Sequence, residues 1–344
     1  MPQFPVVVVG ASAGGVEPLQ EVVAALPPDF PGAVFVVLHI PPYSPSHLPH
    51  ILSQAGPLPA VHPEDGEPVR PGHIYVAPPD HHLLVEGDQV GVKNGPKENR
   101  FRPSVDALFR SAAYTCGAGV IGVVLSGVLD DGASGLWTVK RRGGLTVVQD
   151  PADAQFDSMP VSALEYVDVD YSLPAAEIGA LLAGLVRAGP SPEAEVPMSE
   201  EENRQLEVEV QIAAGGHALR LGLTDLGEPS PFSCPECQGV LYTLKDGTVT
   251  RFRCHTGHAY SLEALLTEVS EDIEEKLYQT LRVMEEGVML LRRMGEQAVQ
   301  AGNTGNAAHL LEKVRQVERQ SELLQRLTQQ AVQSRLDDVL PSSD

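Results

Sequence analysis

The sequence predicts an α/β protein with a doubly wound, mostly parallel sheet, followed by a small zinc-ribbon-like module and a C-terminal helical hairpin. Short apolar runs alternate with segments of helical spacing, a group of cysteines and histidines follows, and the final part repeats apolar residues every three or four positions. The 344 residues suggest two domains with some additional chain. We place the α/β domain at residues 1–190, a linker at 191–202, the module at 203–261 and the hairpin at 262–338.

The α/β prediction begins with residues 6–9, which are four valines followed by Gly10 and are typical of a buried parallel strand. Helical spacing over 17–26 and a second apolar run over 33–40 complete a strand–helix–strand start. Turn signals within residues 68–95 predict an inserted hairpin region. The alternation then returns in five further segments: a helix over 104–116, a strand over 120–125, a helix over 132–142, a strand over 145–148 and a closing helix over 175–187.

The second half is less regular. Residues 188–200 are rich in Pro, Ala and Glu without apolar periodicity, which indicates a linker, and 203–224 predict one or two strands. Two helices are predicted from residue 262 to about 301 and from about 306 to 336, separated by the Gly- and Asn-rich breaker at 302–306. Their apolar stripe fits either packing within a hairpin or self-association through these helices.

Composition and charge exclude several classes of protein. The chain carries 24 basic and 46 acidic residues, for a formal charge of −22, and has no stripe of Lys and Arg, so nucleic-acid binding is not expected. It has no run of 18 apolar residues and no basic leader before an apolar segment, so neither membrane insertion nor a signal peptide is expected. Four cysteines, three of them near histidine, do not form a disulfide framework, and we therefore expect a cytoplasmic protein.

The first candidate for chemistry is Ser12, in the string Gly-Ala-Ser-Ala-Gly-Gly over residues 10–15. This string joins the first strand to the first helix, so Ser12 is expected at the carboxyl edge of the sheet, where open α/β sheets bind ligands. The string also fits the pattern G-x-S-x-G, in which a sharp turn exposes a nucleophilic serine. A ligand-binding turn and a plain strand–helix turn are the alternatives.

A base and an acid would be needed to activate that serine. His39 ends the second strand and therefore shares its edge with Ser12, while His81 and His82 are weaker candidates in the hairpin region. Asp130 and Asp131 follow the strand over 120–125, where one could cap a helix and the other reach the histidine. The pattern does not choose between the two aspartates.

Together these residues resemble the catalytic domain of the CheB family, the chemotaxis protein-glutamate methylesterases. The resemblance covers about residues 5–190, and five motifs carry it: the turn at 10–15, His-Ile-Pro-Pro at 39–42, the segment 64–78, Arg-Phe-Arg-Pro-Ser-Val-Asp at 100–106, and Ser-Gly-Val-Leu-Asp-Asp-Gly at 126–132. It implies Ser12 as nucleophile, His39 as base and Asp131 as the orienting acid. It also implies that Ala13 and Val128 hold the oxyanion or position the substrate, although the family often has Thr and Met at these two places.

By this resemblance the protein hydrolyses glutamate methyl esters on a methylated chemoreceptor or related signalling protein and releases methanol, with glutamine deamidation as a side activity and no catalytic cofactor. Only five residues precede the first strand, so the family's usual N-terminal receiver domain is not expected, and a separate regulatory protein becomes a candidate partner. The alternatives are a non-catalytic signalling scaffold and a serine esterase with another substrate. An intact set of three catalytic side chains argues against the scaffold.

The module contains a candidate metal site. Cys234, Cys237, Cys254 and His258 have the spacing C-x₂-C-x₁₆-C-x₃-H, which suits tetrahedral Zn²⁺. His255 is an alternative fourth ligand, and a redox-active or unpaired cysteine cluster is the alternative to a metal. Because protein side chains would fill all four positions, the expected zinc is structural.

Overall fold

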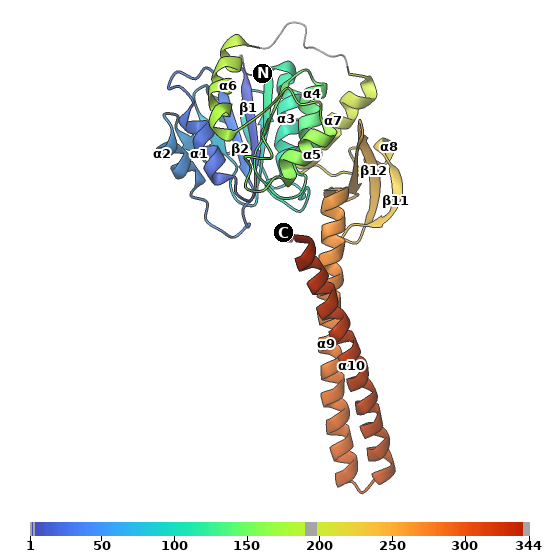
Figure 1. The fold of residues 1–344 in the computed structure, drawn as a ribbon. Helices are drawn as coiled ribbons and strands as arrows, with labels where there is room; N and C mark the ends of the chain where they lie inside the picture. Colours follow the sequence, from blue (N-terminus) through green and yellow to red (C-terminus); the bar gives the residue numbers. More distant parts are fainter. Residues whose placement is uncertain (1, 3, 190–197, 340–344) are drawn as a thin grey trace. The chain divides into compact units, whose positions relative to one another are not determined.

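The computed structural model describes residue 2, residues 4–189 and residues 198–339 (Figure 1). The chain forms two compact units, Met1–Leu265 and Leu266–Asp344, which we describe separately. Most of the linker expected at 191–202 lies outside the described residues, and the next helix already begins at Glu200.

The first unit is built on a seven-stranded, wholly parallel sheet with the order β10-β9-β8-β1-β2-β5-β3. Its strands are β1 (Val6–Ala11), β2 (Ala33–Leu38), β3 (Ala60–Val61), β5 (Ile74–Val76), β8 (Val120–Val124), β9 (Leu145–Gln149) and β10 (Tyr171–Leu173). Every residue of β1 is buried, as expected for a central strand covered on both faces. The predicted parallel sheet is thus confirmed.

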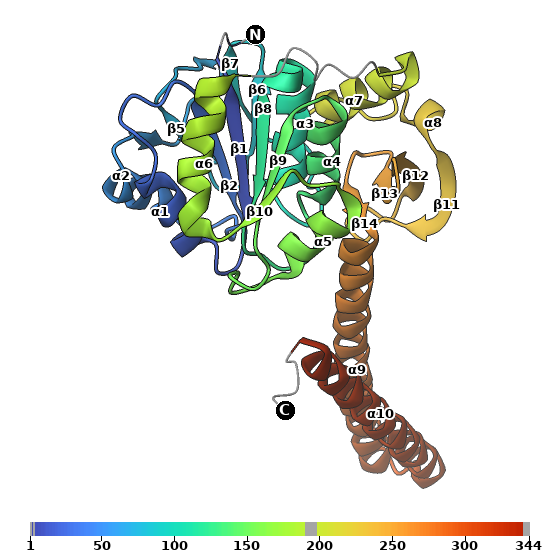
Figure 2. The same cartoon turned by 45° about the horizontal axis from the view of Figure 1, so that its top comes forward.

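Helices cover both faces of this sheet (Figures 1 and 2). Packed on one face are α1 (Val16–Ala24), α2 (Leu48–Ala55) and α6 (Ala175–Ala188). Packed on the other are α3 (Val105–Cys116), α4 (Ala133–Arg141) and α5 (Ser158–Tyr166). A short 3₁₀ turn, Gly117–Gly119, leads from α3 into β8. In the inserted region, β6 (His82–Glu86) and β7 (Gln89–Lys93) form the expected hairpin, and β4 (Glu67–Pro68) pairs with β7.

The module belongs to the same compact unit as the α/β domain. It contains α7 (Glu200–Ala213), α8 (Leu223–Leu226) and an antiparallel sheet of β11 (Glu228–Ser233), β12 (Val240–Asp246), β13 (Val249–Cys254) and β14 (Ala259–Ser261). The strands expected over 203–224 are wrong, because that segment is helical. Alternation in Leu-Glu-Val-Glu-Val-Gln-Ile imitates a strand, but Ser199 and Glu202 form a capping box that starts a helix.

The second unit consists of the expected helical pair. Helix α9 runs Leu262–Gln300, its first residues belonging to the first unit, and α10 runs Thr304–Val339. Ala298, Ala307 and Leu310 pack between the two helices, while α9 also exposes hydrophobic side chains, namely Ile273, Val283, Leu290 and Met294. The self-association expected from these helices stays a prediction. Among the described residues, no helix is long and apolar enough to cross a membrane.

Candidate active site

Ser12 follows β1 at the carboxyl edge of the sheet, in a turn that only small residues permit. The Ser12 backbone N–H donates to Ser126 O at 2.9 Å, and the Ser12 carbonyl accepts from Gly15 N–H at 3.0 Å. Gly14 has φ of +68°, and a Cβ on Gly10 would lie 2.2 Å from a methyl group of Val105. Glycine is thus required at positions 10 and 14 of this turn, which places Ser12 at the sheet edge.

His39 lies next to Ser12 and joins it to an aspartate. Its Nδ1 is 3.2 Å from Ser12 Oγ, and its Nε2 is 2.8 Å from Asp131 Oδ2. With Asp131 ionised, Nε2 carries the proton and donates it, which leaves Nδ1 free to accept from the serine hydroxyl. The ring of Phe101 stacks on the imidazole, with centroids 3.7 Å apart and planes inclined by 7°, and the His39 side chain is only 3% exposed.

The Asp131 carboxylate is the buried centre of a hydrogen-bond network. Its five donors are His39 Nε2 at 2.8 Å, Val105 N at 2.7 Å, Asn99 Nδ2 at 2.9 Å, Ser104 Oγ at 3.0 Å and Asp106 N at 3.2 Å. Burial alone would raise the pKa of Asp131. The hydrogen bond from His39, the charge of His39 and the other hydrogen bonds together hold this pKa below its usual range. Two of the donors are backbone N–H groups at the start of α3, where the helix dipole also favours a negative charge.

Of the two adjacent aspartates, it is Asp131 that contacts His39. Asp131 caps α3, whereas Asp106 on α3 caps α4 by accepting from the N–H groups of Gly132 at 3.0 Å and Gly135 at 2.6 Å. Burial and the nearby charge of Asp131 raise the pKa of Asp106 to about 7. The Asp130 side chain points elsewhere and accepts from Ser261 Oγ at 2.6 Å. This reciprocal capping fixes the two helix N-termini against each other.

Around Ser12, the backbone leaves donors for a developing oxyanion. In the described part of the chain, the N–H groups of Ala13 and Gly14 donate to no protein acceptor. Ser126 holds this turn by donating from its hydroxyl to Ala13 O at 2.9 Å. Val128, by contrast, is 42% exposed and is not among the residues lining the pocket beside Ser12. The expected role of Ala13 has a backbone donor to support it, and that of Val128 stays a prediction.

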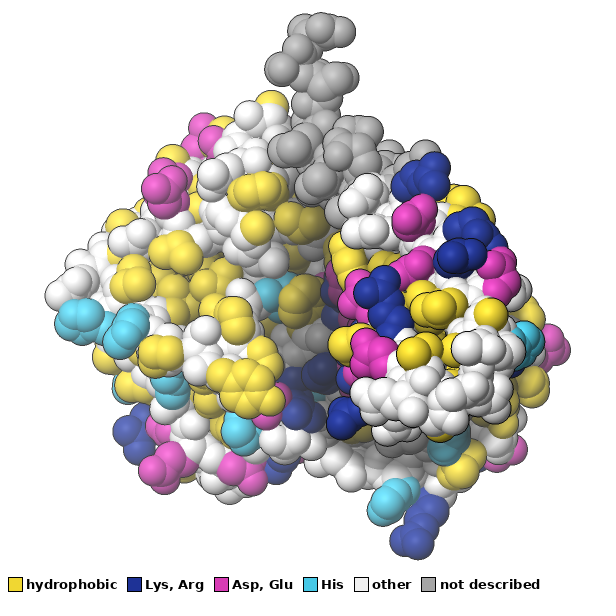
Figure 3. All heavy atoms as spheres, turned by 90° about the horizontal axis from the view of Figure 1, so that it is seen from below, with side chains coloured by type: hydrophobic (Ala, Val, Ile, Leu, Met, Phe, Trp, Pro, Cys, Tyr) yellow, Lys and Arg dark blue, Asp and Glu magenta, His cyan; other side chains and the backbone are white. Residues whose placement is uncertain are grey.

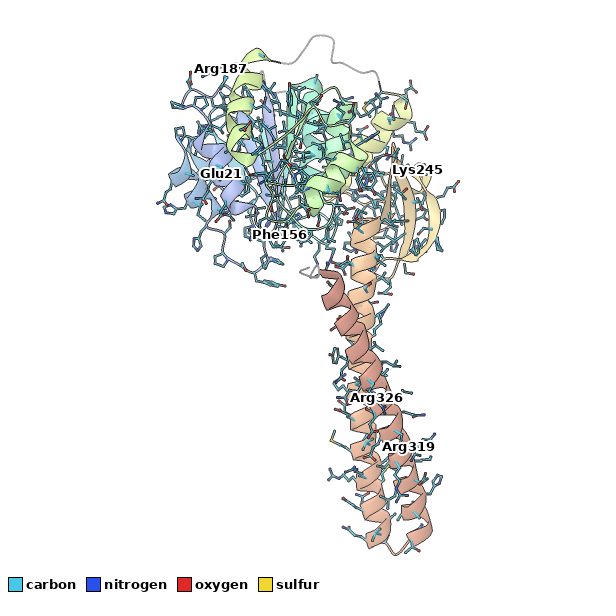
Figure 4. The ribbon with its side chains drawn as sticks, in the orientation of Figure 1. Glu21, Phe156, Arg187, Lys245, Arg319 and Arg326 are labelled. Atoms are coloured by element: carbon cyan, nitrogen blue, oxygen red, sulfur yellow. The ribbon has the colours of Figure 1, made fainter. Side chains whose placement is uncertain are left out.

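The pocket beside Ser12 and His39 has an apolar and a charged side. Ile40, Pro41 and Pro42 contribute the apolar wall. Asp80 and the segment from Lys97 to Arg102 contribute the charged wall, in which Arg102 pairs with Asp80 and Lys97 with Glu236. Hydrophobic side chains also gather on the α/β part of this face (yellow, left in Figure 3). Phe156, 41% exposed, projects at the same lower edge of the domain (Figure 4).

The other candidate histidines lie apart from the serine. His82 is buried and bonded to Pro96 O at 2.9 Å and to Ser104 N–H at 3.3 Å, and its burial lowers its pKa, so it supports the start of α3. His81 contacts the carbonyl of Pro79. The sequence pattern predicts no individual role for Asn99, Phe101 or Ser104. The one signal that points to them is the Arg-Phe-Arg-Pro-Ser-Val-Asp motif at 100–106, which contains Phe101 and Ser104 and directly follows Asn99.

The expected metal ligands come together in the module. The ligand atoms of Cys234, Cys237, Cys254 and His258 all lie within 4.8 Å of one another, and His255 is not among them. Cys237 Sγ is 3.6 Å from Cys254 Sγ, and His258 Nδ1 is 3.6 Å and 3.7 Å from the sulfurs of Cys254 and Cys234. Tetrahedral Zn²⁺ with bonds of about 2.0 to 2.3 Å requires ligand separations of roughly 3.5 to 3.8 Å. The donor set and its spacing therefore fit zinc.

Fold and site together define a class: an α/β enzyme with a Ser–His–Asp arrangement at the carboxyl edge of a parallel sheet. Comparison with known proteins identifies the family within this class.

The family model of the CheB methylesterase matches residues 7–182. A putative protein-glutamate methylesterase/protein-glutamine glutaminase of Leptospira interrogans is 38% identical over 183 residues, which cover 53% of this chain and 95% of that protein. A protein of Rhizobium johnstonii, named protein-glutamate methylesterase/protein-glutamine glutaminase 2, is 40% identical over 50% of this chain and 48% of its own length.

The catalytic domain of the Thermotoga maritima CheB methylesterase has the same fold, with a TM-score of 0.52 and 35% identity over 54% of this chain and all of that one. The chain therefore belongs to the CheB methylesterase family, a family of hydrolases. The family match contains Ser12, His39 and Asp131 and ends at residue 182, before the module begins.

Proposed function

We propose that this protein is a protein-glutamate methylesterase that acts on methylated chemoreceptors or related signalling proteins, with Ser12 as nucleophile, His39 as base and Asp131 as orienting acid. The observation that carries the proposal is the continuous hydrogen-bond relay from Ser12 Oγ through His39 to Asp131. Membership of the family and the names of its relatives support the substrate class.

The reaction follows from the relay. Ser12 Oγ attacks the carbonyl carbon of the γ-methyl ester while its proton moves to His39 Nδ1, and Asp131 stabilises the resulting imidazolium. The oxyanion accepts hydrogen bonds from the free N–H groups of Ala13 and Gly14. The proton returns to the methoxide and methanol leaves. A water activated by His39 then hydrolyses the acyl-enzyme, which regenerates Ser12 and leaves a glutamate side chain on the substrate protein. On a glutamine side chain the same steps release ammonia, which is the proposed deamidase activity.

The experiment is methanol release from a methylated receptor, comparing the intact protein with Ser12→Ala and with the control Ser172→Ala on the exposed strand β10. We expect Ser12→Ala to reduce the rate by at least about 10⁴-fold, because the nucleophile is lost, and the control to match the wild type. Hydrolysis of p-nitrophenyl acetate without methanol release would indicate an esterase for another substrate. No Ser12-dependent hydrolysis of either would indicate the scaffold.

We also propose that Cys234, Cys237, Cys254 and His258 hold one structural Zn²⁺. Sulfur and imidazole donors at tetrahedral spacing support this, as does the small apolar cluster of the module, which consists largely of the ligands and their neighbours. Bound zinc would cross-link the end of β13 to the turn after β11.

The zinc proposal predicts one equivalent of zinc per purified chain, measured by inductively coupled plasma mass spectrometry. Cys254→Ser should lose most of it because a hydroxyl replaces a thiolate ligand. Cys116→Ser, which changes a cysteine of α3 far from the cluster in sequence, is the control and should retain the full equivalent. Equal metal content in both variants would contradict the assignment.

A further inference from the structure

The segment from Lys97 to Phe101 separates the active site from the module. On one side, Lys97, Arg100 and Phe101 line the pocket, and Phe101 stacks on His39. On the other side, the backbone of this segment pairs with β14 of the module, through a bridge between Glu98 and Ala259. This wall of the pocket is therefore backed by a strand that lies more than 150 residues later in the sequence.

Asn99 forms the link at side-chain level. It is 3% exposed, and its amide nitrogen donates to Asp131 Oδ1 and to Asp106 Oδ2, both at 2.9 Å. Its amide oxygen accepts from the backbone N–H of Ser261 at 2.8 Å. The Asn99 amide is thus oriented by β14, and its N–H group donates to the Asp131 carboxylate, which is hydrogen-bonded to His39.

The N-terminal end of β14 adjoins the expected metal ligands. His258 directly precedes β14, and Cys254, the last residue of β13, accepts a backbone bond from Gly257 at 2.9 Å and donates one to His258 O at 2.9 Å. Next along β14, Ala259 N–H donates to Lys97 O at 3.2 Å and Ala259 O accepts from Asn99 N–H at 2.8 Å. The turn that presents two metal ligands therefore continues directly into the strand that supports Asn99.

Charged groups reinforce the same joint. Arg253, adjacent to Cys254, donates to Glu98 Oε1 at 2.8 Å and to Gly257 O at 2.7 Å, and both its own side chain and that of Glu98 are buried. Lys97 Nζ lies 2.6 Å from Glu236, which stands between Cys234 and Cys237. Figure 2 shows β13 and β14 beside the α3, α4 and α5 side of the α/β domain. Each residue from 97 to 99 therefore has a partner in the metal-binding turns or the strands next to them.

We propose that the zinc-loaded module positions the pocket wall 97–101, and that Asn99 is the positioning residue through which the module holds Asp131 in place for catalysis. This inference rests on the proposed esterase function and zinc site. It assigns the module a role that the family match, which ends before it, does not include. Metal loss should loosen β14, release the Asn99 amide and lower the reactivity of Ser12.

The first test separates Asn99 from metal binding. Asn99→Ala should lower kcat/KM for p-nitrophenyl acetate by about 10- to 100-fold, the usual effect of removing a hydrogen bond to a charged group, while zinc stays at one equivalent. Because the Asn99 bond lowers the pKa of Asp131, the acidic limb of the kcat/KM profile should also move to higher pH. The control is Asn94→Ala, an exposed asparagine five residues earlier. Unchanged kcat/KM and pH profile in Asn99→Ala would overturn the proposal.

The second test removes zinc from the wild type with 1,10-phenanthroline and returns one equivalent. We expect the rate at which a fluorophosphonate probe labels Ser12 to fall by about 100-fold and to recover with zinc. Amide hydrogen exchange over 97–105 should accelerate while β1 and β2 remain protected. The fluorescence of the only tryptophan, Trp137 on α4, should change as well, because the β12–β13 turn at Gly247 packs against it.

The outcomes distinguish the two proposals. Equal labelling and equal exchange with and without zinc would overturn the coupling and leave the esterase function intact. If the zinc-loaded wild type does not label at Ser12, the esterase function fails instead. In that case the exchange measurement, which needs no catalysis, still supports the coupling if 97–105 loosens and overturns it if 97–105 does not.

Discussion

Asp131→Asn should lower kcat for ester hydrolysis by about 10⁴-fold with little change in KM. The carboxylate now accepts the proton of His39 Nε2, which leaves Nδ1 as the acceptor that faces Ser12. An asparagine can present its amide nitrogen to His39, which places the imidazole proton on Nδ1. That tautomer cannot take the serine proton, so the nucleophile stays unactivated.

The adjacent residue provides the control. Asp130→Asn makes the same chemical change one position earlier, and its amide oxygen can still accept from Ser261 Oγ. Its kcat should stay within a few-fold of the wild type. Both variants should be compared by active-site titration and steady-state kinetics, with far-UV circular dichroism to verify folding. An equal loss of kcat in Asp130→Asn and Asp131→Asn would show that the two aspartates act as one structural unit. It would contradict the assignment of Asp131 alone as the orienting acid.

The sequence predicts the catalytic residues that directly follow a strand, because the end of the strand determines where they lie. Ser12 and His39 follow adjacent parallel strands, β1 and β2, so position along the chain determines that they share one edge of the sheet. Choosing Asp131 over Asp130 from the residues alone is a different problem. Both follow β8, and only the conformation of that turn, with Leu129 at φ of +65°, determines which carboxylate reaches the histidine. The resemblance to a family, not the pattern, selected Asp131.

Asn99 could not be predicted because its role depends on contacts between distant segments. Its donors reach Asp131 only when residues 97–101 follow an irregular path, with positive φ at Asn99 and Arg100. Its orientation depends on β14, 160 residues later in the chain. No local periodicity encodes such a contact, and a polar residue in a loop is ordinarily solvated.

The error at α7 has a related cause. Alternating apolar and acidic residues over 206–212 resemble a strand in which the acidic side chains face water. Glu209 is instead 1% exposed and lies among three arginines, so the buried face of α7 includes a charge. When a carboxylate such as that of Glu209 is buried, the polar residues no longer mark the solvent-exposed face. The alternation of apolar and polar residues then suggests a strand where the chain is helical.

This buried cluster leads to the second large effect, on stability. Glu209 accepts from Arg251 Nη1 at 2.8 Å and from Arg253 Nε at 2.7 Å, and it lies 3.7 Å from Arg110 Nε. Burial alone would raise the pKa of Glu209, but the three guanidinium groups hold it far below the usual range, so it stays ionised. Glu98 is its counterpart, paired with Arg110 and Arg253. These ion pairs join α3, α7 and β13 inside one compact unit.

Glu209→Ala should therefore lower the free energy of unfolding of the first unit by about 3 to 5 kcal/mol, because it leaves buried positive charge without its partner. Arg251 already has one buried nitrogen, Nη2, without a partner in the described part of the chain, and the substitution would remove another acceptor. The matched control is Glu207→Ala, two residues earlier on the same helix but exposed, which should cost less than about 1 kcal/mol.

Urea unfolding followed by Trp137 fluorescence provides the measurement, since this side chain packs against the turn between β12 and β13. A buried ion pair is not in itself strongly stabilising, so the expected loss in Glu209→Ala reflects uncompensated charge and not the strength of the pair. Glu209→Gln keeps the volume and one of the two acceptor oxygens, but it removes the charge and turns an amide N–H toward a guanidinium group. If the charge balance holds the module on the α/β domain, Glu209→Gln should be destabilised nearly as much as Glu209→Ala. If it instead matches Glu207→Ala, hydrogen bonding and packing alone hold the joint.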